Sequence, residues 1–180
     1  MTAFSLKDKV GLVVGVANKR SISWAIAAEA AAAGAQVVMT YQNVRLEENV
    51  RELAATIADP VVLPCDVTND EEVDAVFAEI NRRFGRLDFV VHGVAFADRD
   101  DLSRPFVETS RDGFRKALDI SAYSLVALAR RAVPLMEKSG GGSLLTLSYL
   151  GAERAFPGYN VMGVAKAALE ASVRYLAADL

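Results

Sequence analysis

The sequence predicts a doubly wound parallel α/β fold in three layers, with helices on both faces of a single sheet. Short apolar runs rich in β-branched residues alternate with longer helical segments along the whole chain. Such alternation requires crossover connections, which give parallel strands that are buried on both faces. The chain has 180 residues, of which 52% are hydrophobic, and this suits one core and a single domain over residues 1–180.

The first half of the chain supplies three strand–helix units. We expect strands in the apolar runs at 10–14, 36–41 and 61–65. We expect helices at 21–33, about 45–58 and about 70–84. Gly34 and Gly85 end the first and third helices, because glycine readily adopts the left-handed conformation that closes a helix. The polar segment 66–70 provides the N-cap of the third helix.

The second half supplies two further strands and two long helices. The expected elements are, in order, a strand at 87–94, a polar loop at 97–105, a helix at about 111–138, a glycine turn at 140–142, a strand at 143–148 and a last helix at 158–180.

A five-stranded flavodoxin-like domain is the alternative to the doubly wound, Rossmann-like order. In the Rossmann-like order the strand at 143–148 lies inside the sheet and pairs with a sixth strand. In this chain that strand would present an apolar, unpaired edge, which is an aggregation hazard. We therefore expect residues beyond Leu180, with the C-terminal strands of the fold lying outside this chain.

Composition excludes several classes of protein. Twenty Lys and Arg against 23 Asp and Glu give a net charge of −3, which argues against a nucleic-acid-binding protein. No apolar stretch is long enough to span a membrane, and the N-terminal residues lack a signal-peptide pattern. One cysteine, Cys65, excludes an internal disulfide, and with one histidine, His92, it argues against a structural zinc site. We expect a cytoplasmic protein without a metal.

The turn after the first strand is a candidate phosphate-binding loop. Gly15 stands beyond the carboxyl end of a strand, where a doubly wound sheet binds its ligands. Ser21 starts the next helix, whose N–H groups and positive end would face a pyrophosphate. The usual G-x-G-x-x-G pattern is absent, so a plain turn at Gly15 and a plain N-cap at Ser21 form the alternative.

The ends of the second and third strands carry candidate nucleoside-binding residues. Gln42 stands where dinucleotide-binding proteins usually place an acidic residue for the adenosine ribose. A neutral amide can hydrogen-bond to ribose hydroxyls without favouring a 2′-phosphate, so NAD is the expected cofactor. Asp66 can accept a hydrogen bond from the adenine amino group while Val67 packs on the ring; alternatively, Asp66 only starts a turn.

Tyr159 and Lys166 are the candidate catalytic pair. They are seven residues apart in the last expected helix, which puts both on one face, about 10 Å apart along the axis. A cofactor ribose fits between them, with Lys166 holding its hydroxyls and the Tyr159 phenol directed at the substrate. The nearby lysine favours a phenolate or a strongly polarised phenol. The alternative is a surface pair without function.

Several motifs carry a resemblance to a known family. They are Gly15 with Ser21-Ile22, TYQN at 40–43, CDV at 65–67, SYLGAERAFPGYNVMGVAK at 148–166 and LEASVRYLA at 169–177. Together they resemble the enoyl-acyl-carrier-protein reductases of type II fatty-acid synthesis, a divergent branch of the short-chain dehydrogenase/reductase superfamily. The superfamily usually has Tyr-x-x-x-Lys, but Gly163 stands four residues after Tyr159 and the lysine comes at seven. The Tyr-(x)6-Lys spacing is typical of the branch.

The resemblance implies a role for each matching residue. It places Gly15, Ser21 and Ile22 at the pyrophosphate, Gln42 at the adenosine ribose, Asp66 and Val67 at the adenine, Val94 along the cofactor, Ala97 near the acyl substrate, Tyr159 and Lys166 as the catalytic pair, and Tyr149 as a second tyrosine facing the active site. The segment Gly93-Val94-Ala95 departs from the Ser-Ile-Gly of many relatives.

The implied activity is NADH-dependent reduction of trans-2-enoyl thioesters on acyl carrier protein, by a homotetramer. Two alternatives are a short-chain reductase of ketoacyl thioesters, which Gly163 opposes, and a non-catalytic dinucleotide-binding protein. A Cys–His nucleophile is disfavoured, because Cys65 and His92 lie in apolar runs without an acyl-transfer motif. A metal site at Asp98, Asp100 and Asp101 is disfavoured, because these residues are expected in a solvated loop.

Overall fold

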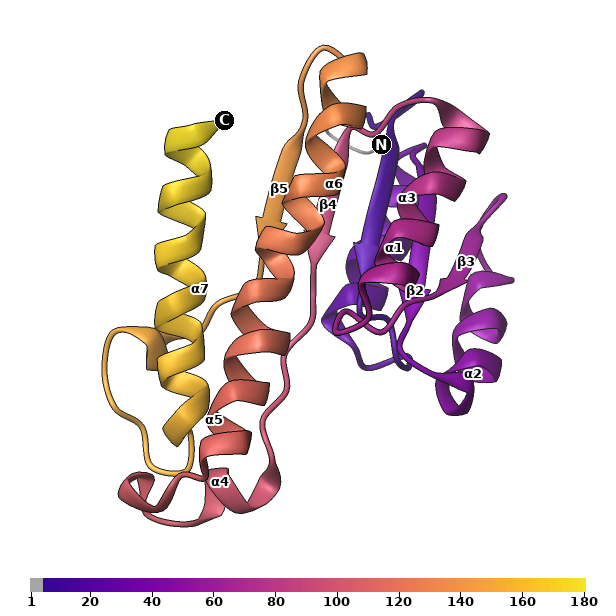
Figure 1. Cartoon of the computed structure of the whole chain (residues 1–180). Helices are drawn as coiled ribbons and strands as arrows, with labels where there is room; N and C mark the ends of the chain where they lie inside the picture. Colours follow the sequence, from indigo (N-terminus) through magenta and orange to yellow (C-terminus); the bar gives the residue numbers. More distant parts are fainter. Residues whose placement is uncertain (1–4) are drawn as a thin grey trace. The chain divides into compact units, whose positions relative to one another are not determined.

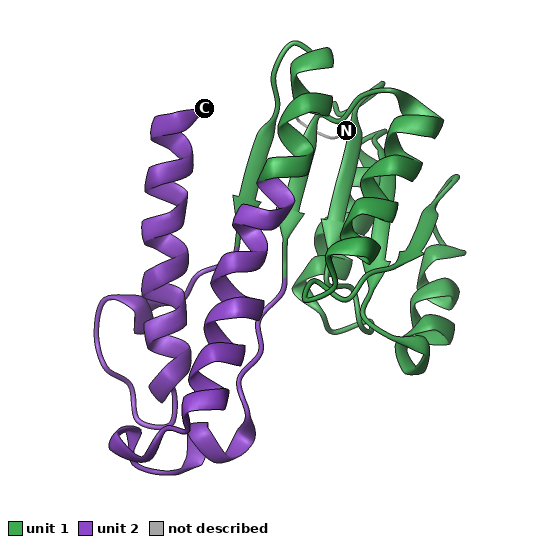
Figure 2. Ribbon diagram, in the orientation of Figure 1, with its two compact units in different colours: residues 1–93, 130–146 green, residues 94–129, 147–180 purple. Residues whose placement is uncertain are grey.

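The computed structural model describes residues 5–180, which divide into two compact units (Figure 2). Unit 1 holds the described residues up to 93 together with 130–146, and it carries the sheet. Unit 2 holds residues 94–129 and 147–180, and it carries the last helix. The single domain expected over residues 1–180 stays a prediction.

Unit 1 is built on a five-stranded parallel sheet in the order β3-β2-β1-β4-β5 (Figure 1). The strands are β1 (Val10–Val14), β2 (Gln36–Tyr41), β3 (Val61–Pro64), β4 (Phe89–His92) and β5 (Ser143–Thr146). The register pairs Val13 with Met39 and Val14 with His92, so the carboxyl ends of neighbouring strands meet at one edge of the sheet. The strand order reverses between β1 and β4, which confirms the doubly wound, Rossmann-like prediction.

Helices cover both faces of this sheet. α1 (Ile22–Ala32) and α2 (Val44–Ala54) pack on one face, where Ala27 and Val50 join strand residues in one hydrophobic cluster. α3 (Asp70–Phe84) packs on the other face (Figure 1). Arg131, in the part of α6 that belongs to unit 1, forms ion pairs with Asp70 and Asp74 of α3. The three-layer prediction therefore holds within unit 1.

Local capping explains why α3 begins and ends where the sequence predicts. The Asn69 side chain accepts hydrogen bonds from the N–H groups of Glu71 (3.0 Å) and Glu72 (3.4 Å). Gly85 closes the helix with a φ of 66°, in the left-handed region. The predicted bounds of 70–84 are confirmed.

Several other predicted segments are longer than the elements that form. The strands predicted at 61–65, 87–94 and 143–148 shorten to β3, β4 and β5, and the helices predicted at 21–33, about 45–58 and 158–180 shorten to α1, α2 and α7 (Asn160–Asp179). Neighbouring strands end at paired positions: the last pairs are Tyr41 with Pro64 and His92 with Thr146. Beyond these pairs, the Cys65 N–H still donates to the Tyr41 carbonyl (2.8 Å) and the Gly93 N–H to the Val14 carbonyl (3.1 Å), but the apolar residues that follow belong to no strand.

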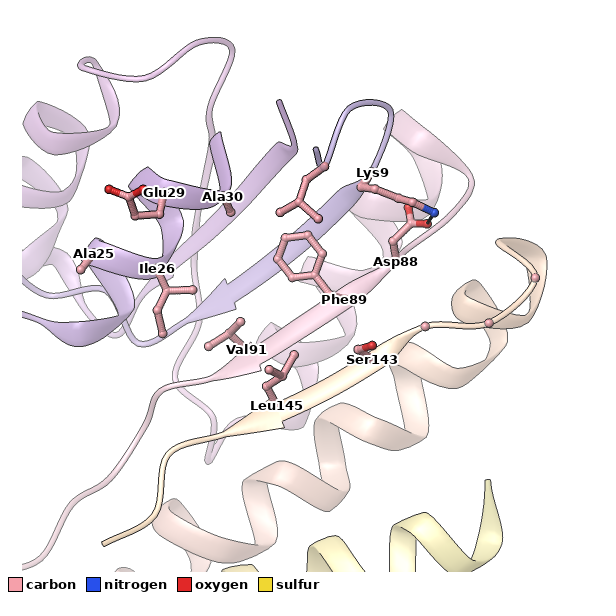
Figure 3. Close-up of a pocket in the computed structure, with 14 residues that line it drawn as sticks. Lys9, Ala25, Ile26, Glu29, Ala30, Asp88, Phe89, Val91, Ser143 and Leu145 are labelled. Atoms are coloured by element: carbon pink, nitrogen blue, oxygen red, sulfur yellow. Dashed lines mark hydrogen bonds and ion pairs between the residues drawn. The ribbon is translucent and has the colours of Figure 1, made fainter. Parts of the chain in front are cut away.

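A hollow of about 840 Å³ lies on the α1 face of the sheet beside β4 and β5 (Figure 3). Ile26, Phe89, Val91 and Leu145 give it an apolar lining. The ring of Phe89 fills the space over Gly11, where a Cβ would lie 1.9 Å from Cζ of the ring. β5 is an edge strand among the described residues and leaves Leu145 half exposed, as the sequence predicts.

Unit 2 is helical, and it contains a helix where the sequence predicts a loop. Its elements are α4 (Arg99–Ser103), η1 (Phe106–Glu108), α5 (Arg111–Leu118), η2 (Asp119–Tyr123), the first part of α6 (Ser124–Lys138), η3 (Leu150–Ala152) and α7. The loop prediction over 97–105 is wrong, because α4 forms within this segment and its Asp101 is only 5% exposed. Its carboxylate accepts hydrogen bonds from the Ser110 N–H (2.8 Å) and hydroxyl (3.0 Å) at the start of α5, which orders the segment.

The long helix predicted over about 111–138 forms in three parts. α5 and α6 are joined by η2, a turn of π-helix. A π turn inserts an extra residue into the helix, and the hydrophobic period of the sequence does not reveal it. Ser121 and Ala122 are buried in this turn. The prediction of one uninterrupted helix is corrected accordingly.

The amino ends of β1 and β4 are held together by the buried carboxylate of Asp88. It accepts hydrogen bonds from the Val10 N–H (2.9 Å), from Lys9 Nζ (3.0 Å) and from Arg86 (2.7 Å). Burial by itself raises the pKa of Asp88, but the hydrogen bonds from Arg86, Val10 and Lys9 together outweigh it, so the pKa lies below its ordinary value. The ionised carboxylate therefore stabilises unit 1 at neutral pH.

We expect Asp88→Asn to lower the free energy of unfolding at pH 7 by about 1–3 kcal/mol. This is the range for a hydrogen bond to a charged group, extended downward because solvent partly screens the charges of Lys9 and Arg86. A group with a depressed folded pKa stabilises the fold above its unfolded pKa, about 3.9 for aspartate, and this contribution is lost as the pH falls through the folded value. The difference between variant and wild type in urea denaturation should therefore shrink below about pH 4. A difference that persists unchanged into acid would show that the charge is not responsible.

Candidate functional site

The predicted phosphate loop follows β1 and starts with a left-handed glycine. Gly15 has a φ of 90°, a conformation that a side chain disfavours. The loop is tied to β2, because the N–H groups of Gly15 and Val16 donate to the Thr40 hydroxyl (3.4 Å) and carbonyl (3.0 Å). Ser21 stands at the N-cap of α1, but its hydroxyl donates to the Asn18 carbonyl (2.6 Å) and therefore closes the loop instead of capping the helix.

The structure brings Gln42 and Asp66 together at the ends of β2 and β3. Gln42 Nε2 donates to Asp66 Oδ2 at 3.3 Å. Asp66 also accepts from the Thr68 N–H (3.0 Å) and hydroxyl (2.7 Å). Burial raises the pKa of Asp66, but these hydrogen bonds outweigh burial and the pKa lies below its ordinary value. Asp66 is thus an ionised acceptor at neutral pH, beside the half-buried Val67.

Ser23 is a structural residue of this edge that the sequence does not predict. It is 2% exposed in α1, and its hydroxyl lies 3.3 Å from the Val14 carbonyl and 3.5 Å from the Gly93 carbonyl. A Cβ on Gly93 would lie 1.9 Å from the Ser23 hydroxyl and 2.9 Å from the Val14 carbonyl oxygen, so a side chain at this position requires Ser23 to shift. Nothing in the sequence pattern signals this contact between segments that are far apart in the chain.

Val94 and Ala97 lie in the first segment of unit 2, and the buried Ser121 holds this segment at Phe96. The Ser121 hydroxyl accepts from the Phe96 N–H (2.9 Å) and donates to the Phe96 carbonyl (3.1 Å). Ser121 is fully buried within the π turn, which puts its hydroxyl toward this segment. The helical pattern of the sequence predicts an ordinary helix here, so it gives no sign of this role of Ser121.

Lys166 is buried in unit 2, with an exposed fraction of 6%. Its Nζ donates to the carbonyl of Leu147, the residue that follows β5, at 2.6 Å. Burial lowers the pKa of Lys166. The alternative of a solvated surface lysine is therefore wrong. A buried ammonium needs hydrogen-bond partners, and the Leu147 carbonyl is one.

Tyr159 lies at the N-cap of α7 and packs against a second tyrosine. The rings of Tyr149 and Tyr159 are 4.8 Å apart and tilted by 57°, and Phe156 lies 5.4 Å from Tyr149. Burial, and then the charge of Tyr149, raises the pKa of Tyr159. Of the two expected forms, the phenolate is wrong, because burial raises the pKa of Tyr159 and the Lys166 ammonium donates to the Leu147 carbonyl; the polarised phenol stays a prediction.

The backbone of η3 explains why the lysine is not four residues after Tyr159. A Cβ on Gly163 would lie 2.8 Å from the Gly151 carbonyl oxygen, too close for any side chain. A Cβ on Gly151 would lie 2.4 Å from the Tyr159 ring. Lys166 stands nearly one turn further along α7, where its side chain is buried.

Other candidate chemistry is not assembled. Burial, the largest cause, and the charges of Glu72 and Asp66 raise the pKa of the Cys65 thiol to about 12, so it is not a nucleophile. Residues 5–180 contain no group of three metal-ligating side chains. Asp98 pairs with Lys116 (2.9 Å) and Asp101 is buried, so the expectation of a wholly solvated acidic loop is wrong. None of the helices in this described part has the length and apolar character of a membrane span.

Comparison with known proteins agrees with these features. A family model described as Enoyl-(Acyl carrier protein) reductase matches residues 15–180. The chain belongs to the enoyl-acyl-carrier-protein reductase family. The reductase is 56% identical to the NADH enoyl-acyl-carrier-protein reductase FabI of Bacillus cereus over 177 residues, which are 97% of this chain and 68% of that protein. It is 51% identical to FabI of Bacillus subtilis, over 98% of this chain and 69% of that protein.

Solved structures give the same relationship. The Bacillus cereus reductase with NADP⁺ and an indole naphthyridinone has a TM-score of 0.95 and 56% identity, over 98% of this chain and 69% of that one. The Anaplasma phagocytophilum reductase with NAD has a TM-score of 0.94 and 47% identity, over 100% of this chain and 68% of that one. The predicted Rossmann-like α/β fold is thus confirmed by solved structures of the family.

In the reductase, we expect Gly163→Ala to lower the free energy of unfolding by about 1–3 kcal/mol, because the added methyl forces the η3 backbone to move. Val173→Ala, at a partly exposed position of the same helix, is the control and should change stability by less than about 0.5 kcal/mol. Both are measured by urea denaturation. Equal stability of the two variants would contradict the steric argument.

Proposed function

We propose that the reductase uses NADH to reduce the carbon–carbon double bond of trans-2-enoyl thioesters carried on acyl carrier protein, the reductive step of fatty-acid elongation. The observation that carries the proposal is the buried ammonium of Lys166, seven residues after the Tyr159 phenol on α7. Burying a lysine is unfavourable without partners. An ammonium can donate three hydrogen bonds, and among residues 5–180 the Lys166 Nζ donates one, to the Leu147 carbonyl.

The residues of unit 1 fit the dinucleotide. The left-handed turn at Gly15 and the N–H groups at Ser21 and Ile22, where α1 starts, suit a pyrophosphate. The Gln42 carboxamide suits the adenosine ribose hydroxyls. Asp66, ionised, suits the adenine amino group, and Val67 suits its ring.

In unit 2, Val94 would contact the cofactor, and Lys166 would hold the ribose next to the nicotinamide. When bound, NADH supplies the hydride that reduces the β-carbon of the substrate. Negative charge then develops on the thioester oxygen, and the Tyr159 O–H would donate a hydrogen bond to it. Addition of a proton from solvent at the α-carbon completes the reduction. The raised pKa of Tyr159 supports this role, because a donor has to keep its proton at neutral pH. Tyr149 packs on Tyr159, and Ala97 stands near the acyl chain.

The proposal extends to the setting of the reaction. Acyl carrier protein presents the substrate, the enzyme acts in the cytoplasm, and it assembles as a homotetramer. Exposed apolar side chains on α7, among them Tyr175 with an exposed fraction of 76%, support burial against a further copy.

One assay tests the reaction. NADH absorbance is followed with crotonyl and acetoacetyl thioesters side by side. Consumption with the enoyl thioester alone supports the proposal, and consumption with the keto thioester alone would make the protein a carbonyl reductase. Binding of NADH without turnover of either substrate would make it a non-catalytic dinucleotide-binding protein.

We expect Tyr159→Phe to lower kcat by about 100- to 1000-fold, the range for loss of one donor to a developing oxyanion. The ring and its packing on Tyr149 are retained, so the dissociation constant for NADH should hardly change. Steady-state kinetics and fluorescence titration measure the two effects. An unchanged kcat would remove Tyr159 from the mechanism and make Tyr149 the candidate donor.

Lys166→Ala should weaken NADH binding on the order of 10- to 100-fold, since a hydrogen bond to a charged group contributes about 1.5–3 kcal/mol. Lys166→Arg keeps the charge but not the compact ammonium, so its recovery should be partial. In the wild type, NADH affinity should fall as the pH rises through the lowered pKa of Lys166, whereas Lys166→Ala should lack this dependence. Equal affinities in wild type and both variants would exclude contact between Lys166 and the cofactor.

A further inference from the structure

The backbone around Tyr159 is unusual at the start of α7. Gly158 has a φ of 75° and Asn160 a φ of 39°, so Tyr159 lies between two residues in the left-handed region. Glycine adopts this region freely, but asparagine adopts it only where its contacts offset the strain. The contacts of Asn160 therefore help to decide where the helix begins and where Tyr159 is held.

The carboxamide of Asn160 supplies those contacts. Its Nδ2 donates to the carbonyl oxygens of Arg104 (2.8 Å), Leu102 (3.0 Å) and Asp101 (3.3 Å). These carbonyls belong to the end of α4 and the residue after it. The last carbonyls of a helix lack partners within the helix, and Asn160 provides one from the first residue of α7.

α4 is a fixed support for this contact. The Asp101 carboxylate accepts from Ser110 at the start of α5, and Asp98 pairs with Lys116 in α5 at 2.9 Å. A Cβ on Gly113 would lie 1.7 Å from Asp101 Oδ2, so the Asp101 carboxylate of α4 occupies the space over this glycine of α5. Asn160 thus joins α7 to a helix that is itself held on α5.

We propose that Asn160 is a positioning residue for Tyr159, which it aims by holding the first residue of α7 against the end of α4. The inference rests on the proposed function, in which the Tyr159 phenol donates to the thioester oxygen. Asn160 itself touches no reacting atom. A misplacement of about 1 Å costs on the order of 100-fold in rate, so loss of the Asn160 contacts acts on kcat and not on substrate affinity.

Two substitutions separate the carboxamide from the backbone conformation. Asn160→Gly keeps the left-handed freedom and removes the donors, and Asn160→Asp keeps the shape but sets carboxylate oxygens against three carbonyls. We expect each to lower kcat about 10- to 100-fold, with less than about a 3-fold change in KM for crotonyl thioester and in Kd for NADH. Wild-type kcat in Asn160→Gly would overturn the proposal, and this variant decides if Asn160→Asp does not fold.

A matched control removes another asparagine that ties two helices. In unit 1, Asn81 accepts a hydrogen bond from Lys138 at 3.0 Å. Asn81→Ala should leave kcat at the wild-type value. A loss of kcat in this variant equal to that in Asn160→Gly would assign the effect to general destabilisation and overturn the proposal.

A double-mutant cycle excludes a merely structural role. If Asn160 acts through the phenol, Asn160→Gly costs nothing further once the hydroxyl is gone, so the double variant with Tyr159→Phe has the kcat of Tyr159→Phe alone. If Tyr159→Phe lowers kcat and the double variant lowers it further, by the product of the two single losses, this inference is overturned and the proposed function is left intact. Wild-type kcat in Tyr159→Phe alone would instead overturn the catalytic role of Tyr159, and the positioning role with it.

Discussion

Because all five strands of unit 1 are parallel, their carboxyl ends meet at one edge, and the candidate nucleotide-binding residues of that unit leave from this edge. Each segment then has one local constraint of its own, a backbone conformation or a contact. Gly15 turns left-handed, Gln42 bonds to Asp66, and Gly93 admits the buried Ser23 hydroxyl. An antiparallel strand anywhere in this order would send its loop to the opposite edge, so the site depends on the pairing before it depends on any side chain.

The fold is predictable because its signals are local. Apolar runs bounded by turns predict the strands, and the bounds of α3 follow from Asn69 and Gly85, which act within their own turns. α4 is not predictable in this way, because its order depends on a hydrogen bond between Asp101 and Ser110, and the charge of the segment suggests solvent. The π turn at Asp119–Tyr123 likewise has no periodic signature.

The candidate site follows the same division. Residue types at strand ends, and the spacing of Tyr159 and Lys166, are visible in the sequence. Their partners are not: the contact of Lys166 with Leu147 depends on tertiary packing, as does the closing role of the Ser21 hydroxyl. Burial also decides against one of the two expected forms of Tyr159, the phenolate, since it raises the pKa of the phenol.

The contact between Gly151 and Gly163 also bears on how the two lysine spacings can be related by descent. A lineage that carried its lysine at position 163 would collide with the carbonyl 2.8 Å away unless the 150–152 turn were rerouted in the same step. A change from one spacing to the other therefore requires two concerted changes, one at position 163 and one in the backbone of the 150–152 turn.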